Sequence, residues 1–245
     1  MKTYNRIFIT GDKHRDFRHM SSELSRLNAC NTDLVILLGD VGLNYDNGPF
    51  DLLGKAELAR IGCDFLCVHG NHERRPDSVD IVWSYSSVPW NGGTVFQESD
   101  FPTLLFAKDG EFYTINQKSV LAIGGAYSVN KKYLLAMKRP WFYDEQLFKN
   151  EKEEVLQKIT EHGNQADIIL SHTCPHDHMP RESFLNGIDQ LNIDCSMELF
   201  LQKISSTIRY QAWYCGHYHV EKDNDRVHFL FQTVKTIFEN GAWNL

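Results

Sequence analysis

Hydrophobic residues in this chain gather in short uninterrupted runs, and each of the first three runs is followed within two residues by a glycine. These runs cover residues 6–10, 33–38 and 64–68. Between them, apolar side chains in residues 17–28 recur at helical spacing, which predicts an amphipathic helix, and a second helix is predicted over about 51–61. Continuous apolar strands are typical of parallel sheets covered on both faces. The alternation of strand and helix therefore predicts a parallel α/β sheet.

The second half of the chain predicts further strands and outer helices. Asp109-Gly110 lies between two strand-like segments in residues 103–115, which indicates a β-hairpin. The other predicted elements are strands over 119–123, 167–171 and 211–215, a long loop over 126–141, helices over about 145–161 and from an Asp194 cap to Ile204, and one or two closing strands over 227–237. The simplest packing of this order is one domain over residues 1–245. Its predicted fold class is α/β, with a two-sheet β-sandwich flanked by helices.

Length and charge restrict the classes of partner. The chain has 245 residues and a formal net charge of −7. Non-specific nucleic-acid binding needs basic surface and is not expected, although metal ions can make a positive pocket for phosphate in an acidic protein. No apolar stretch approaches membrane-spanning length, and the N-terminus runs directly into a strand without room for a signal peptide. We therefore expect a cytoplasmic protein with no membrane partner.

Candidate chemistry is concentrated in four short blocks that each follow an apolar run. The blocks are Gly11-Asp12-Lys13-His14, Gly39-Asp40, Gly70-Asn71-His72-Glu73 and Gly216-His217-Tyr218-His219, with Ser171-His172 between the last two. Carboxylate and amide oxygens suit hard divalent cations, and imidazole suits borderline metals such as Mn²⁺, Fe or Zn²⁺. Any one block alone is better explained by turn residues and structural histidines. Their joint order and placement after predicted strands favour a two-metal hydrolytic site.

The ordered blocks, which span residues 11–219, resemble the calcineurin-like metallophosphoesterase superfamily, whose pattern is G-D-x-H, G-D, G-N-H-D/E, an isolated His and G-H-x-H. The resemblance implies a four-layer α/β/β/α fold and two divalent metal ions as cofactors. It also implies one set of ligands for each ion and a bridging carboxylate. One ion would be held by Asp12, His14 and His219, the other by Asn71, His172 and His217, and Asp40 would bridge both.

The same resemblance implies a mechanism in which a metal-bridging hydroxide attacks phosphorus and His72 protonates the leaving group. The expected substrate is a phosphodiester or a small phosphomonoester, including a nucleotide. A serine/threonine-type phosphoprotein phosphatase is the alternative, but that branch extends its second block as G-D-x-V-D-R-G, which residues 39–46 do not match. A non-catalytic metal-binding scaffold is a further alternative, against which the complete ligand set argues. Asp46 and Glu73 are candidates for orienting His72.

Residues that contact the substrate are harder to assign from the sequence. Arg15, where the family usually has Gly, would either hold a phosphate oxygen or be a surface charge. Specificity is expected in the loops over 126–141 and 173–190, since loops on a rigid scaffold often carry it. The candidates in these loops are Tyr127, Lys131, Arg139, His176 and His178, for which a solvated loop is the competing interpretation.

Overall fold

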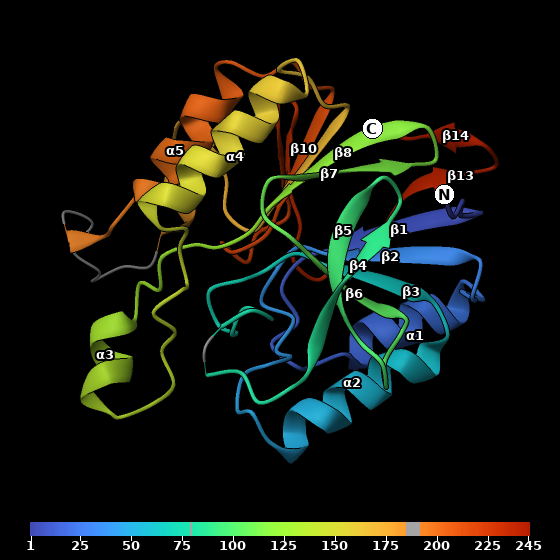
Figure 1. Cartoon of the computed structure of the whole chain (residues 1–245), viewed down its shortest axis with the longest axis horizontal. Coiled ribbons are helices and arrows are strands. Elements are labelled where there is room, and N and C mark those ends of the chain that lie inside the picture. The colour runs from blue at the N-terminus through green and yellow to red at the C-terminus, as the bar shows by residue number, and fades with distance from the viewer. Residues whose placement is uncertain (79, 185–191) are drawn as a thin grey trace.

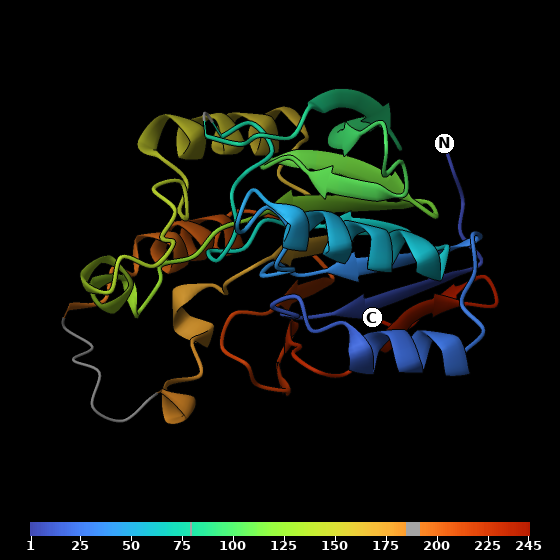
Figure 2. The same cartoon turned by 90° about the horizontal axis from the view of Figure 1, so that it is seen from below.

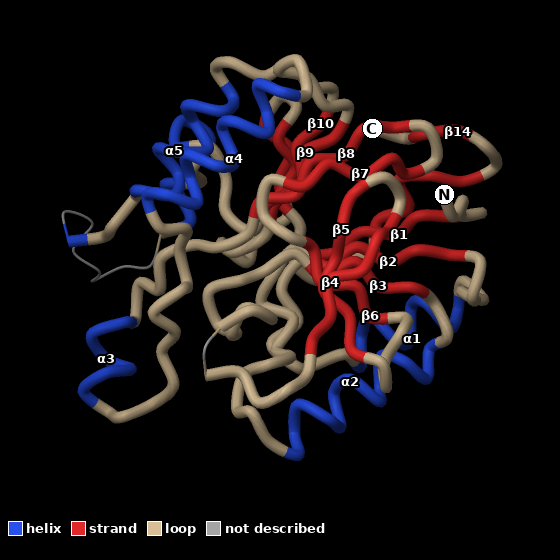
Figure 3. Tube along the Cα trace, viewed as in Figure 1, coloured by secondary structure: helices blue, strands red, loops and turns tan. Residues whose placement is uncertain are grey.

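The computed structural model describes residues 1–78, 80–184 and 192–245. Two β-sheets of eight and six strands lie face to face, and helices cover their outer faces (Figure 1 and Figure 3). This arrangement confirms the predicted α/β fold with a two-sheet sandwich flanked by helices. Residues 185–190 of the predicted specificity loop lie outside the described residues.

The eight-stranded sheet is built mainly from the first part of the chain. Its parallel centre contains β1 (Arg6–Thr10), β2 (Asp33–Leu37), β3 (Asp64–Cys67) and β6 (Leu104–Ala107). One edge is completed by β5 (Gly93–Glu98) and β4 (Tyr85–Trp90), and the other by β13 (Lys235–Glu239) and β14 (Ala242–Trp243). The connecting helices α1 (Arg18–Arg26) and α2 (Pro49–Ile61) cover the outer face.

The six-stranded sheet follows in the chain and is covered by its own pair of helices. Its strands, in spatial order, are β11 (Lys222–Asn224), β12 (Val227–Phe229), β10 (Ala212–Cys215), β9 (Ile168–Ser171), β8 (Lys118–Ile123) and β7 (Glu111–Ile115). The covering helices are α4 (Lys149–Glu161) and α5 (Ser196–Ser205). The short helix α3 (Lys131–Ala136) lies to one side of both sheets (Figure 1 and Figure 2).

Three hydrophobic clusters correspond to the three interfaces between these four layers. Alternate residues of a strand point to opposite faces, so Ile7 and Ile9 of β1 pack between the sheets while Phe8 packs under α1 and α2. In β8 and β9, Leu121 and Ile169 pack instead against α4 and α5. Both faces of the central strands are therefore buried, as their continuous apolar sequences predict.

The predicted hairpin at Asp109-Gly110 is wrong. The strands on either side, β6 and β7, belong to different sheets, so this turn carries the chain from one sheet to the other. The Asp109 carboxylate accepts hydrogen bonds from Gly124 N and from Arg75, and it ties the crossover to β8 and to the loop after β3. The real hairpin turn joins β7 and β8 through Asn116-Gln117, where both residues have positive φ (43° and 68°), as a type I′ turn requires.

Other predicted boundaries also differ from the structure. The hairpin of β4 and β5 turns at Asn91-Gly92, a strong local turn signal that carried no prediction above. The predicted loop over 126–141 contains α3. Helix α4 begins at Lys149 rather than near 145, because the backbone of Phe148 is extended (φ −69°, ψ 167°) and its N–H donates to Glu151 Oε2 (2.6 Å). Among the described helices, none is long and apolar enough to cross a bilayer.

A buried ion pair joins α2 to the eight-stranded sheet. Lys55 is fully buried, its ammonium pairs with Glu98 of β5, and it lies 4.6 Å from the centroid of the Trp83 ring. In Lys55→Met the Glu98 carboxylate loses its counter-charge, so we expect the free energy of unfolding to fall by about 3–5 kcal/mol in chemical denaturation. Lys55→Met combined with Glu98→Gln should recover most of this loss.

The matched control is Lys149→Met, which breaks an exposed pair with Glu153 on α4. Exposed pairs contribute little to stability, so the control should unfold like the parent protein. If Lys55→Met is equally harmless, the buried pair does not stabilise the packing of α2.

Candidate metal centre

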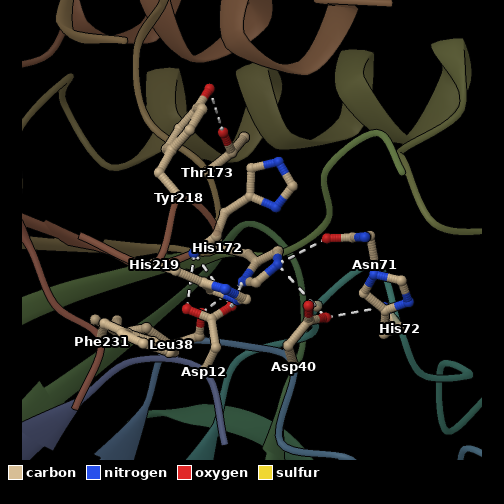
Figure 4. A network of polar contacts seen from close by, with 12 residues as sticks. Asp12, Leu38, Asp40, Asn71, His72, His172, Thr173, Tyr218, His219 and Phe231 are labelled. Atoms are coloured by element: carbon tan, nitrogen blue, oxygen red, sulfur yellow. Dashed lines mark hydrogen bonds and ion pairs between the residues drawn. The ribbon is translucent and has the colours of Figure 1, made fainter. Parts of the chain in front are cut away.

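All seven predicted metal ligands lie at the carboxyl ends of strands from both sheets. Asp12, Asp40 and Asn71 follow β1, β2 and β3 of one sheet, while His172 and the His217/His219 pair follow β9 and β10 of the other. Parallel strands end at a common edge, so residues far apart in the sequence meet there. Figure 4 shows Asp12, Asp40 and Asn71 grouped around the imidazole of His172. The structure therefore brings these residues together, whereas their roles as ligands stay a prediction.

The glycines that begin the blocks allow this close convergence. A Cβ atom at Gly39 would overlap the His172 imidazole, and one at Gly70 would overlap the backbone and carboxylate of Asp40. The residues presented by the turns are themselves unusual, because His14, Asp40, His217 and His219 have φ between 44° and 69°. Backbone strain of this kind costs about 1–3 kcal/mol per residue and clusters at functional sites.

One group of candidate ligands consists of Asp12, Asp40 and His172, whose ligand atoms all lie within 4.8 Å of one another. All three side chains are buried. Burial raises the pKa of Asp12 to about 7. Burial also acts to raise the pKa of Asp40, but the charge and hydrogen bond of His172, together with the nearby His72 and His14, outweigh it and hold that pKa well below its ordinary value. Backbone N–H groups of His217 (2.9 Å) and His72 (2.8 Å) donate to Asp12 and Asp40 respectively.

The hydrogen bonds of His172 and Asn71 show that this group fits a cation. His172 Nδ1 lies 2.7 Å from the Leu38 carbonyl oxygen, which can only accept, so Nδ1 carries the hydrogen. Asn71 Nδ2 donates to Ser128 Oγ (2.9 Å), which leaves Asn71 Oδ1 2.9 Å from His172 Nε2. Without a metal, burial acts to lower the pKa of His172, but the nearby Asp40 and Asp12 carboxylates outweigh it and raise that pKa to about 9, so Nε2 holds a second proton that Asn71 Oδ1 accepts. A divalent cation would take the place of that proton between the two acceptors, and the Leu38 contact is typical of a metal-ligating histidine.

A second group consists of Asp12, His14 and His219, which is more open to solvent. His14 Nε2 lies 3.0 Å from His219 Nε2 and 3.7 Å from Asp40 Oδ2. Burial, followed by the charge of His14, lowers the pKa of His219 to about 4, and burial also lowers the pKa of His14. Both shifts favour the neutral imidazole, which is the form that ligates metal.

The carboxylate common to the two groups is Asp12, whereas Asp40 was expected to be the bridge. Asp40 also reaches both sides, because its oxygens lie 3.5 Å from His172 Nε2 and 3.7 Å from His14 Nε2. His217 is in neither group, although its ring centroid lies 5.1 Å from that of His172. The described residues thus contain two adjacent Asp/His groups that could hold metal.

His72 lies beside the two groups without joining either. Its backbone is fixed by the hydrogen bond to Asp40, and its ring is half-buried 5.6 Å from that of His14. Glu73 accepts hydrogen bonds from Gly42 N (3.0 Å) and Gly70 N (2.9 Å), and Asp46 pairs with Arg15. Neither proposed orienting carboxylate forms a hydrogen bond with the His72 ring in the described part of the chain.

A cavity of about 310 Å³ opens over the candidate ligands. Six of its lining residues are polar residues of the candidate ligand blocks and are called the floor: His14, Asp40, Asn71, His72, His217 and His219. The other five are called the wall: Val129, Asn130, Ser183, Phe184 and Tyr218. The wall therefore comes largely from the two loops that the sequence indicated as specificity loops. The particular wall residues were missed, because apolar residues in loops carry no signal of which side faces a site.

The six predicted substrate contacts do not line this cavity as the structure describes it. The guanidinium of Arg15 is held by carboxylates instead, at 2.5 Å from Asp51 Oδ1 and 3.3 Å from Asp46 Oδ2. Asp51 belongs to the first turn of α2, so Arg15 joins the first block to that helix.

The loop candidates are likewise engaged or exposed elsewhere. The ammonium of Lys131 lies 3.9 Å from the Trp141 ring centroid and 5.8 Å from that of Tyr127, and Arg139 is exposed. His176 and His178 belong to a short 3₁₀ helix, and the His176 ring contacts the side chains of Asp177 and Arg181. The residue type of a loop side chain does not show whether it faces the cavity, and none of these side chains lines it.

Comparisons with known proteins agree with this geometry. The calcineurin-like phosphoesterase family model (Metallophos) matches residues 5–221. The solved structure of TT1561 of Thermus thermophilus is similar, with a TM-score of 0.51 and 11% identity over 96% of this chain and 98% of that one.

Two further solved structures are similar at lower TM-scores. The phosphopantetheinyl hydrolase PptH of Mycobacterium tuberculosis has a TM-score of 0.42 and 15% identity, covering 94% of this chain and 89% of its own. The calcineurin-like phosphoesterase YfkN of Bacillus subtilis has a TM-score of 0.38 and 13% identity, and the match covers 100% of this chain and 89% of that one. No curated protein matches the sequence significantly. Because the family match covers most of the sequence and the blocks meet at one point in the fold, the chain belongs to the calcineurin-like phosphoesterase family.

Proposed function

We propose that this protein hydrolyses a phosphodiester or a small phosphomonoester. The observation that carries the proposal is the buried group of Asp12, Asp40 and His172, in which the Leu38 carbonyl orients the imidazole toward both Asn71 and Asp40. This group lies beside a cavity of about 310 Å³, near the lower end of the range for small-ligand sites. Membership of the family supports phosphate esters as the substrate class.

The proposed cofactors are two divalent ions, with Mn, Fe and Zn all compatible with mixed imidazole and carboxylate ligands. Asp12, His14 and His219 would hold one, and Asn71, His172 and His217 the other, with Asp40 and Asp12 both placed to contact each. When bound, such ions supply positive charge for phosphoryl oxygens and make coordinated water acidic.

Side chains of the protein would donate the proton to the leaving group and position the ligands. His72 has its backbone fixed on Asp40 and lines the cavity, while its ring nitrogens form no hydrogen bond with other described residues. It is therefore placed to give a proton to the departing ester oxygen. Glu73 holds the turns that carry Asp40 and Asn71 at a constant separation through Gly42 N and Gly70 N.

Substitution of His72 tests the catalytic part of this proposal. In His72→Ala we expect kcat for a nitrophenyl phosphate ester to fall about 10²–10⁴-fold, because a general acid is lost, while the metal content stays unchanged. The exposed His162, which stacks on Phe112 at the far end of α4, provides the matched control His162→Ala. Turnover and metal content are measured on the same manganese-loaded samples.

Two results would contradict the assignment in different ways. A joint loss of turnover and metal in His72→Ala would make His72 a residue that supports the metal site. A parent protein that binds two ions but turns over neither a monoester nor a diester would be a non-catalytic scaffold.

Metal binding should also stabilise the fold, because the ligands come from both sheets. At a Mn²⁺ concentration 100 times the Kd, binding adds about 2.7 kcal/mol, which corresponds to a rise in Tm of roughly 5–10 °C for a chain of this size. Asp12→Asn should abolish the rise, whereas Asp177→Asn, which alters an exposed carboxylate between two histidines, should retain it. A rise that survives in Asp12→Asn would place the ion elsewhere.

A further inference from the structure

We infer that the group esterified to the phosphate carries a flat aromatic ring, and that Phe184 and Tyr218 form the surface that receives it. This inference rests on the proposed function, since it names the substrate class of the same cavity. Phe184 and Tyr218 are called the aromatic platform below.

The chemistry of the cavity is divided between its floor and its wall. All six floor residues are polar, whereas three of the five wall residues, Val129, Phe184 and Tyr218, are apolar or aromatic. The other two, Asn130 and Ser183, are uncharged. A phosphate ester bound with its phosphoryl group on the floor would therefore place its organic group against an uncharged, largely apolar surface. Such a surface disfavours a charged or strongly hydrated leaving group, because its polar groups would lose water without finding partners.

The two rings of the platform are nearly parallel. Their planes differ by 13° and their centroids are 6.1 Å apart, although Phe184 comes from the end of a 3₁₀ turn and Tyr218 from the last ligand block. Flat ligands gain from offset stacking on such surfaces, and a saturated ring of similar volume does not. Phe184 and Tyr218 are both partly exposed, so each ring retains area that a ligand can cover.

A buried chain of hydrogen bonds holds the Tyr218 side of the platform in place. The Thr173 hydroxyl donates to the buried Glu198 of α5 (2.7 Å) and lies 3.3 Å from the Tyr218 hydroxyl. The geometry makes Thr173 Oγ1 the donor in both contacts, so its one hydroxyl hydrogen is shared between Glu198 and Tyr218. Figure 4 shows this contact and the Tyr218 ring directed away from the carboxylates. The ring is thus fixed beside the floor and left free of any role in metal ligation.

The sequence position of Tyr218 ties the platform to the candidate ligands. It lies between His217 and His219, so the turn that presents two candidate ligands also presents the ring. His217 and Tyr218 have ring centroids 5.0 Å apart. Both platform residues line the same cavity as the floor residues.

Direct binding of non-hydrolysable phosphonates tests the inference without requiring turnover. The manganese-loaded protein is titrated calorimetrically with phenylphosphonate and cyclohexylphosphonate, and separately with the 5′-phosphonate analogues of adenosine and of ribose. We expect the flat member of at least one pair to bind about tenfold more tightly. A preference in the first pair indicates a simple aryl ester, and one confined to the second indicates a nucleotide.

Variants then assign the preference to the platform. Phe184→Leu and Tyr218→Leu should each reduce the ratio of the two Kd values to within about twofold of one. Tyr218→Phe keeps the ring and should retain most of the ratio, and the matched control Phe50→Leu, on the exposed start of α2, should retain all of it. Metal content measured on each variant shows that the floor is intact.

Equal affinities within both pairs, no binding of any phosphonate, or a preference that survives in both leucine variants would overturn the inference. Failure of the proposed function gives a separate result. In that case the preference for flat phosphonates and its loss in Phe184→Leu would be observed in a protein that hydrolyses no phosphate ester.

Discussion

Two carboxylates buried within 4.8 Å of a shared imidazole are the constraint on which the rest of this structure depends. Burial of charge is unfavourable unless the charge is paired or hydrogen-bonded. Asp12 and Asp40 receive backbone N–H groups from His217 and His72, and His172 lies between them. His72, His172 and His217 each follow the end of a strand. The buried charges are therefore paired only when the strands of both sheets are correctly aligned. The glycine turns follow from the same crowding, because side chains at Gly39 or Gly70 would occupy the space of a ligand.

The floor and the wall of the cavity are built by different physical means. The floor depends on sheet hydrogen bonds and on three hydrophobic layers, which leave little freedom to the strand ends. The wall comes from connections after β8 and β9, where substitutions and insertions are better tolerated. Chemistry common to the family can therefore persist on the floor while the wall changes with the substrate. Tyr218 is the exception, since it belongs to the wall but is carried by a floor turn.

The sequence predicted those features of the fold and site that depend on neighbouring residues, and it did not predict those that depend on contacts between distant residues. The continuous apolar runs of β1, β2 and β3 predicted buried parallel strands, and the polar residues after them predicted a common edge. The turn at Asp109-Gly110 misled, because a dipeptide does not say whether the next strand stays in the same sheet. The ion pair of Arg15 was not visible in the sequence for a related reason. Its partner Asp51 lies 36 residues away, and the sequence shows a free charge where the structure has a pair. Phe184 gave no signal at all, since a single aromatic residue in a loop has no period to analyse.

The division of the candidate ligands between the two sheets has a consequence during synthesis. Asp12, Asp40 and Asn71 are made early, but His217 and His219 follow only after β10, and β13 must then return to pair with β1. A nascent chain that ends before His217 consequently contains five of the seven candidate ligands and lacks the pair that completes the two groups. The candidate site is complete only once β10 has paired with β9 and β13 has returned to β1.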